Sequence, residues 1–159
     1  MTAKLTRSAL LLLVVMITTI ACNRSLVVER VNYSQPVESV ITPTDDGIIQ
    51  NRRYGITFSI LPIQYEELRD TSNVLVDEVR MIRDQNGFYY ITASGFNHVY
   101  VMKPGTGELK LEKKISIGDQ QLISPAFNWR SPVVQLIDLD QNKEFYLNHN
   151  GIIKGEDQS

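Results

Sequence analysis

The sequence predicts a mainly β fold: an antiparallel meander that forms a small sandwich or open barrel, with one short helix and an N-terminal signal helix. Two observations predict it. Beyond residue 73, short runs rich in β-branched and aromatic residues alternate with turns that contain glycine, asparagine or proline. A chain of 159 residues is also long enough for one such domain.

The composition excludes several classes of protein. The chain carries 16 Lys and Arg residues against 18 Asp and Glu, whereas a nucleic-acid-binding protein would carry a basic excess. Its hydrophobic fraction of 43% is too high for a wholly disordered chain. The single cysteine cannot form a disulfide within the chain. We therefore expect no nucleic acid among the partners.

The N-terminus has the pattern of an export signal. Lys4 and Arg7 precede an uncharged run over residues 8–23, whose centre (ALLLLVVMI) is strongly apolar. This run is shorter than the roughly 20 residues that a membrane-spanning helix needs. A signal helix is therefore the better interpretation than a permanent transmembrane anchor.

Residues 19–22 (TIAC) resemble the lipobox of bacterial lipoproteins, in which small or aliphatic residues lead into a cysteine at the cleavage point. The only cysteine of the chain falls where this pattern requires one. The resemblance implies that Cys22 becomes the first residue of the mature chain. It also implies a diacylglycerol on the Cys22 sulfur and an acyl chain, such as palmitate, on its amine. Several acyl chains give a stable membrane anchor.

Two alternatives for Cys22 stay open at this point: an ordinary apolar cysteine in an uncleaved helix, or a free thiol after cleavage elsewhere. Asn23 follows the cysteine, and a residue other than aspartate at that place is similar to the outer-membrane sorting signal of enteric lipoproteins. We therefore expect a lipid-anchored protein of the bacterial cell envelope, at the outer membrane and facing the periplasm.

The pattern divides the chain into a signal peptide over residues 1–21, a lipidated tether over 22–51, a β domain over 52–151 and a frayed tail over 152–159. The tether is expected because prolines and the turn signal at residues 45–47 (DDG) interrupt this part of the sequence. One short strand is expected within it, over residues 26–31.

The expected elements of the β domain follow in order. Ile56, Phe58 and Ile60 alternate with polar residues, which is typical of a half-buried strand that Pro62 ends. Helix-forming residues then predict a short helix over residues 63–70. Four strands that form a meander are then expected over residues 74–83, 88–92, 98–102 and 109–112, with the leucines of the fourth facing inward.

Two segments repeat one pattern. Residues 81–89 (MIRDQNGFY) and residues 137–146 (IDLDQNKEFY) both predict a hairpin around an Asp-Gln-Asn turn. In the first turn a glycine, Gly87, stands where a positive φ angle is needed. The second hairpin joins strands expected over residues 133–137 and 145–147.

Residues 75–117 resemble one four-stranded blade of the NHL or six-bladed propeller type, because an aromatic strand, a Ser-Gly pair, an asparagine and an aliphatic strand follow one another. A closed ring needs at least four blades of roughly 40 residues each, so this chain is too short for a propeller. A sheet folded on itself is the expectation, and assembly of blades between chains is left open.

Few residues suggest chemistry. His98 and His149 each follow an asparagine, and isolated histidines of this kind are usually surface or strand-end residues. Asp138 and Asp140 match ligand positions of an EF-hand loop, but Lys143 stands where that loop requires glycine, so no metal site is expected.

The remaining candidates are binding residues. Trp129 and Arg130 are the best of them, because both types are enriched at binding hot spots and residues 127–132 read as a loop. The alternative is that Trp129 closes one end of the β core. The pair Arg52-Arg53 is interpreted as solvated, and residues 105–107 (GTG) as a connection between strands and not a phosphate loop.

These observations favour a non-enzymatic binding or assembly module whose partner is another envelope protein or a glycan, without a cofactor. The alternative is a small periplasmic enzyme, or an inhibitor of one, that uses Asp138, Asp140 and a histidine. A histidine within hydrogen-bond reach of a carboxylate inside a pocket would favour the enzyme.

The substitution Cys22→Ala tests the anchor. Because the variant lacks the sulfur that receives the lipid, it should incorporate no labelled palmitate and should accumulate as the unprocessed precursor. Metabolic labelling and gel mobility measure both effects. Equal labelling of the wild type and the variant would contradict the lipid anchor.

Overall fold

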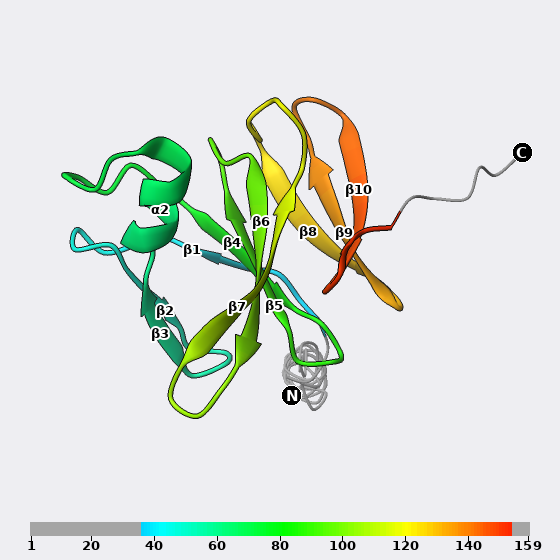
Figure 1. Ribbon diagram of the computed structural model, residues 1–159, viewed down its shortest axis with the longest axis horizontal. Helices are drawn as coiled ribbons and strands as arrows, with labels where there is room; N and C mark the ends of the chain where they lie inside the picture. The colour runs from blue at the N-terminus through cyan, green and yellow to red at the C-terminus, as the bar shows by residue number, and fades with distance from the viewer. Residues whose placement is uncertain (1–35, 154–159) are drawn as a thin grey trace, which may run out of the picture. The chain divides into compact units, whose positions relative to one another are not determined.

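The computed structural model describes residues 36–153, which form antiparallel β-sheets and one short helix. This part of the chain confirms the predicted mainly β class, in the form of a small sandwich with no closed barrel among the described strands (Figure 1). The expected signal helix, the cleavage site, Cys22 and the strand expected over residues 26–31 lie outside the described residues.

A five-stranded sheet forms the middle layer, in the order β1-β4-β5-β6-β7. Its last four strands are neighbours in the sequence as well as in the sheet, which confirms the predicted meander. Aromatic and β-branched residues favour extended backbone in these strands, and positions two apart face the same layer. The strands are β1 (Ser39–Ile41), β4 (Val79–Arg83), β5 (Tyr89–Ala93), β6 (His98–Pro104) and β7 (Leu109–Ser116).

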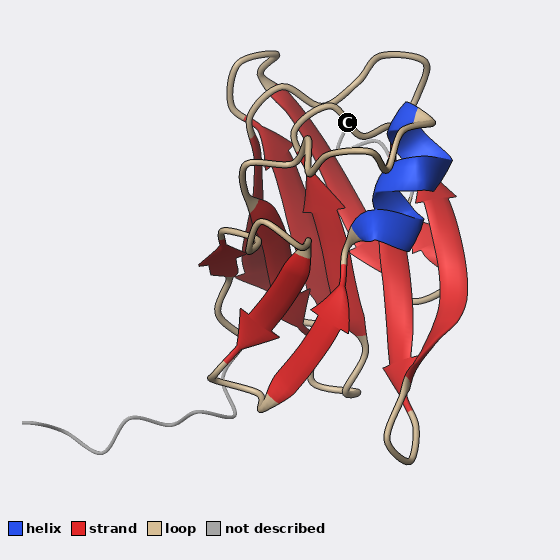
Figure 2. Ribbon diagram, turned by 90° about the vertical axis from the view of Figure 1, so that its left-hand side faces the viewer, coloured by secondary structure: helices blue, strands red, loops and turns tan. Residues whose placement is uncertain are grey.

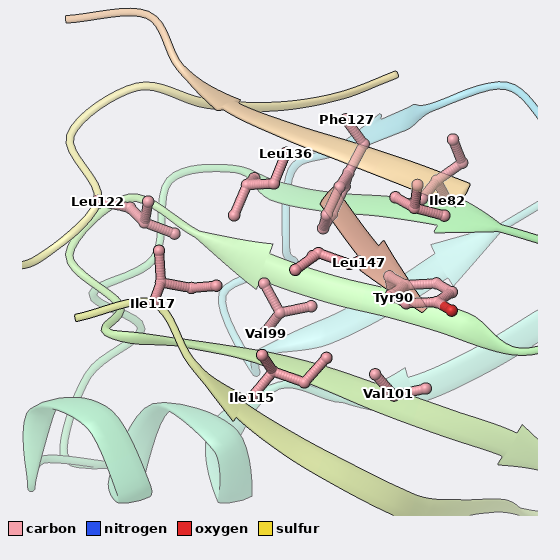
Figure 3. Packing of buried hydrophobic residues seen from close by; sticks show 11 residues of the cluster. Ile82, Tyr90, Val99, Val101, Ile115, Ile117, Leu122, Phe127, Leu136 and Leu147 are labelled. Atoms are coloured by element: carbon pink, nitrogen blue, oxygen red, sulfur yellow. The ribbon is translucent and has the colours of Figure 1, made fainter. Parts of the chain in front are cut away.

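A four-stranded sheet, in the order β11-β10-β9-β8, covers one face of the five-stranded sheet. Side chains from both sheets meet in a first hydrophobic core, where Leu136 and Leu147 lie opposite Tyr90 and Val99 (Figure 3). The strands are β8 (Pro125–Arg130), β9 (Val133–Asp138), β10 (Lys143–Asn148) and β11 (Gly151–Ile152).

The opposite face of the five-stranded sheet is covered by the hairpin of β2 (Ile48–Asn51) and β3 (Ile56–Ser59) together with helix α2 (Leu61–Leu68). Figure 2 shows the helix and the hairpin in front of the sheet. A second hydrophobic core lies beneath them, and its fully buried members include Ile49, Ile60, Met81, Ile91 and Phe96. Because both faces of the middle layer are covered, β5 is buried along its whole length.

Both predicted Asp-Gln-Asn hairpins are present. In the β4–β5 turn, Asp84 Oδ1 accepts a hydrogen bond from the backbone N–H of Phe88 at 2.9 Å, and Gly87 has φ 91°. In the β9–β10 turn, Asp138 accepts from local N–H groups and Asn142 takes the positive φ, at 50°. Asparagine tolerates this left-handed conformation better than most residues, so the second hairpin needs no glycine there.

The strands of the structure extend beyond the predicted β domain of residues 52–151 at both ends. Residues 39–41 and 48–51, expected in the tether, form β1 and β2. β1 pairs with β4, and Ile49 is fully buried in the second core, so these residues belong to the folded domain. The prolines and the DDG turn that suggested a tether flank and connect the two strands. At the other end, Ile152 of β11 pairs with Leu147 of β10, so Ile152 does not belong to a frayed tail.

Two further expectations differ from the structure in detail. The helix begins at Leu61 rather than Ile63, because Pro62 is tolerated in a first helical turn, where a backbone N–H has no helical partner. Leu111 is 52% exposed rather than inward-facing. Met102 pairs with Leu111 and Val101 with Lys113, so Glu112 is an extra residue that shifts the register of β7.

Glu38, just before β1, joins the two main sheets. Its Oε1 accepts a hydrogen bond from the backbone N–H of Phe127 in β8 at 2.7 Å. Its Oε2 lies 3.5 Å from the guanidinium of Arg80 in β4. Burial raises the pKa of this carboxyl above its ordinary value, although the Phe127 N–H and the Arg80 charge oppose that shift.

Gln64 ties α2 to the loop that follows it. Its side chain is fully buried, and its Nε2 donates hydrogen bonds to the carbonyl oxygens of Asp70 and Asn73 at 2.8 and 2.7 Å. Its Oε1 accepts from the backbone N–H of Leu75 at 2.8 Å. One side chain thereby satisfies three backbone groups of a loop that has no secondary structure of its own.

Gln64→Ala should therefore lower the free energy of unfolding by about 2–4 kcal/mol, because it leaves those three backbone groups without a hydrogen-bond partner and creates a cavity. Urea denaturation measures the effect. Gln85→Ala is the matched control, because Gln85 is an exposed glutamine in a turn and its loss should cost less than about 0.5 kcal/mol. Equal losses in the two variants would contradict the role assigned to Gln64.

Candidate functional site

One candidate site is an apolar cleft of about 680 Å³ beside β3, which we call the β3 cleft. It opens over the face of the five-stranded sheet that carries the second core. Tyr89 and Ile91 of β5 and Met102 of β6 form its floor. Pro104 and Leu109, from the β6–β7 hairpin, also line it. A volume of this size is in the usual range for ligand-binding sites, which are mostly apolar.

β3 forms one wall of the cleft along its entire length. Residues 54–59 all line the cleft, without a gap. Successive side chains of a strand point to opposite faces, so an unbroken run of lining residues means that the cleft lies along the edge of the strand. Backbone groups of β3 as well as side chains are therefore available in this wall.

Aromatic rings and cations meet where the cleft reaches Tyr54. The rings of Tyr54 and Tyr89 are 5.5 Å apart in an edge-to-face arrangement. The guanidinium carbon of Arg83 lies 5.4 Å from the Tyr89 ring centre and 6.0 Å from that of Tyr54, which is within cation–π range. Arg53 lies 5.8 Å from the Tyr54 ring centre. The predicted pair Arg52-Arg53 thus belongs to the β2–β3 turn, with Arg52 exposed.

A second group of polar side chains lies where α2 packs on β6 and β7. The Glu67 carboxylate, which is only 2% exposed, is at its centre. Its Oε1 accepts a hydrogen bond from the Tyr100 hydroxyl at 2.5 Å and lies 2.8 Å from His98 Nδ1. Its Oε2 accepts from the backbone N–H of Asn97 at 2.8 Å. Lys114 Nζ is 3.6 Å from Glu67 and 2.8 Å from Glu66.

The protonation states in this group follow from its contacts. Burial raises the pKa of Glu67. The hydrogen bonds from Tyr100 and Asn97, together with the nearby His98 and Lys114, lower it by a larger amount, so the pKa of Glu67 lies below its ordinary value. Burial and the facing carboxylates raise the pKa of Tyr100. An ionised Glu67 and a neutral Tyr100 therefore fasten α2 to the sheet.

His98 satisfies only part of the condition for an enzyme. It has a carboxylate partner, which sequence reasoning missed because Glu67 is distant in the chain and belongs to another element. Neither His98 nor Glu67 lines the β3 cleft, however. His149 instead stacks on Phe88, with ring centres 4.6 Å apart and planes 5° from parallel.

Asp138 is committed to holding its own turn. It is fully buried and accepts hydrogen bonds from four backbone N–H groups, at distances of 2.9–3.3 Å. Asp140 is exposed at the surface of the same turn. The partners of Asp138 are the backbone amides of Ile123, Ser124, Asp140 and Gln141, and neither histidine is among them. Across residues 36–153, no group of three or more His, Cys, Asp or Glu residues is placed to hold a metal ion.

The predicted loop over residues 127–132 is wrong in its first part. Trp129 and Arg130 end strand β8 and pair with Val134 and Val133. Trp129 is half-buried and packs against the first core, as the alternative interpretation expected. Arg130 Nε donates a hydrogen bond to Gln135 Oε1 at 3.0 Å. Both residues belong to the four-stranded sheet, whereas the β3 cleft lies on the five-stranded sheet.

Comparison with protein-family models, with curated proteins and with solved structures finds no match to this chain. No helix within the described residues is long and apolar enough to cross a membrane.

Asp138→Asn should lower the free energy of unfolding at pH 7 by about 1–3 kcal/mol, because an amide is a weaker acceptor than a carboxylate for backbone N–H groups. Burial raises the pKa of Asp138, but its four N–H donors lower it more, so the folded pKa lies below the ordinary value. The stabilisation is complete above the unfolded pKa of about 4 and is lost as the pH falls through the folded pKa.

The difference between wild type and Asp138→Asn should therefore shrink as the pH falls from 6 to 3, in urea denaturation at each pH. Asp140→Asn is the matched control on the exposed side of the same turn, and its effect should be small. A difference that stays constant down to pH 3 would contradict the charge-assisted role of Asp138.

Proposed function

We propose that the chain is a lipid-anchored, non-enzymatic lipoprotein of the bacterial cell envelope that binds a partner through the β3 cleft. The anchor is Cys22, and the expected position is the outer membrane, facing the periplasm. The lining of the cleft is the observation that carries the binding role: aliphatic and aromatic side chains surround it, and its titratable members are Tyr54, Tyr89 and Glu108.

This lining favours binding over catalysis. An apolar concave surface gains free energy when it removes a partner's apolar groups from water. Burial raises the pKa of Tyr89, which keeps that hydroxyl neutral at physiological pH. The groups that resemble catalytic residues, Glu67 with His98 and Asp138, are engaged in fastening the fold. The alternative, an enzyme that uses Asp138, Asp140 and a histidine, therefore has weaker support.

Another envelope protein is the preferred partner, with a glycan as the alternative. Ile91, Met102 and Leu109 present aliphatic surface, which suits the side chains of a protein better than the hydroxyl groups of a sugar. The anchor and the cleft also act together, because attachment to a membrane raises the local concentration of the binding site near partners in the same membrane.

Site-specific photo-cross-linking in native envelopes tests this function. A photoreactive residue at Glu108, which lines the cleft and has a 55% exposed side chain, should give a discrete adduct with a partner protein. The same residue at Leu139, which is 63% exposed in the β9–β10 turn, should not.

Three further results decide between the candidates. Retention of the protein on immobilised envelope saccharides, without a protein adduct at Glu108, would show the glycan alternative. Adducts of equal yield at Glu108 and Leu139, or neither an adduct nor saccharide binding, would contradict the binding role of the cleft.

A further inference from the structure

We propose, on the basis of the binding function above, that the β3 cleft takes an extended peptide segment as an added strand on β3, with a carboxylate of that segment at Arg83. Addition of a strand to an exposed sheet edge is a common mode of peptide recognition, in which main-chain hydrogen bonds give affinity and side-chain pockets give specificity.

The hydrogen-bond pattern of the β2–β3 hairpin shows which backbone groups of β3 are free for such a strand. Ile60 N donates to the carbonyl oxygen of Gly47 at 2.9 Å, which fixes that opposed pair as a hydrogen-bonded one. Hydrogen-bonded pairs recur at every second residue of an antiparallel ladder. Ile56 and Phe58 therefore point their N–H and C=O groups toward β2, and Thr57 and Ser59 point theirs away from it.

Thr57 and Ser59 both line the β3 cleft. Within residues 36–153, β2 is the only strand that pairs with β3. The second edge of β3 thus offers two N–H donors and two C=O acceptors at the spacing of a β ladder. Unpaired edges of this kind are templates for another chain, and most proteins cover or block them.

The floor of the cleft suits alternate side chains of the added strand. In an extended segment, every second side chain faces the same way. Those side chains would lie over Tyr89, Ile91 and Met102, which form a continuous apolar surface across β5 and β6. A segment that alternates apolar and polar residues therefore matches both the backbone edge and the floor.

Arg83 supplies the charge complementarity for a carboxylate. Arg83 is not itself a lining residue, but its guanidinium carbon lies 5.4 Å from the ring centre of Tyr89 and 6.0 Å from that of Tyr54, and both tyrosines line the cleft. In the described part of the chain, Arg83 Nε is buried without a hydrogen-bond acceptor. A guanidinium matches a carboxylate in geometry and charge, and a carboxylate at this place would be the counter-charge that Arg83 lacks among residues 36–153.

The surrounding charges favour an anion at this end. Arg53 lies over the Tyr54 ring, and Arg52 is exposed in the same turn. Glu108, on the β6–β7 hairpin, is the one carboxylate among the residues that line the cleft, and its Oε1 is 3.1 Å from Lys110 Nζ. The carboxylate of the partner segment is either its C-terminus or an acidic side chain, and the test below separates the two.

The probe is a library of random hexapeptides, made once with free C-terminal carboxylates and once as C-terminal amides, and presented to the full chain in detergent. Retained peptides should alternate apolar and polar residues and carry a carboxylate. A preference for the free-acid library identifies a C-terminal carboxylate, and retention of acidic peptides from both libraries identifies a side chain. Arg83→Gln should weaken binding of retained peptides by about tenfold or more.

Two variants at Thr57 isolate the backbone contact. Thr57→Pro removes the N–H that faces the cleft and leaves the β2–β3 ladder complete, because that N–H takes no part in the ladder. It should abolish peptide binding. Thr57→Val keeps the N–H and changes only an exposed side chain, so it should bind within about twofold of wild type.

Amide hydrogen exchange in the wild type gives a readout that does not depend on the folding of the proline variant. Bound peptide should slow exchange at Thr57 and Ser59. Strand addition would be overturned if peptides bound without this protection, or if Thr57→Pro and Thr57→Val bound peptide equally well. It would also be overturned if no peptide were retained although the Glu108 adduct forms. Each of these results would leave the binding function standing. Absence of both a Glu108 adduct and saccharide binding would overturn the binding function itself.

Discussion

The five-stranded sheet has two apolar faces, and each must be removed from water by a separate cover. Tyr90 on one face belongs to the first core, whereas its neighbours Tyr89 and Ile91 face the second. A simple two-sheet sandwich would leave the second face exposed. The β2–β3 hairpin and α2 cover it in part, and the β3 cleft is the portion that they leave open. The site is therefore a consequence of how the middle layer is buried.

The buried polar side chains of this protein each join segments that are distant or irregular. Gln64 secures the loop after α2, Asp138 secures the β9–β10 turn with the preceding loop, and Glu67 secures α2 to β6. Each is satisfied by groups of the protein itself, as buried polar groups generally must be. Their lone pairs and donors are thus occupied, and the surface left for a partner is apolar side chains and strand edge.

Elements that depend on residues close together in the sequence were predictable. Elements that depend on pairing between distant residues were not. The Asp-Gln-Asn turns and the alternation of Ile56 and Phe58 lie within a few residues of one another, so the hairpins and β3 could be read directly. β1 could not, because its partner Met81 is far along the chain and its flanking prolines are typical of a linker. The β3 cleft brings residues 54–59 together with Ile91 and Leu109, which no short window of sequence contains together.

Glu38 has a mechanical consequence. Tension applied along the backbone from the N-terminal side enters the described domain just ahead of β1, a strand of three residues that a single ladder would hold weakly. Through Phe127 and Arg80, the Glu38 carboxylate spreads that load over both main sheets. Both sheets of the sandwich therefore resist the pull together, and β1 is not simply peeled from the edge of one sheet.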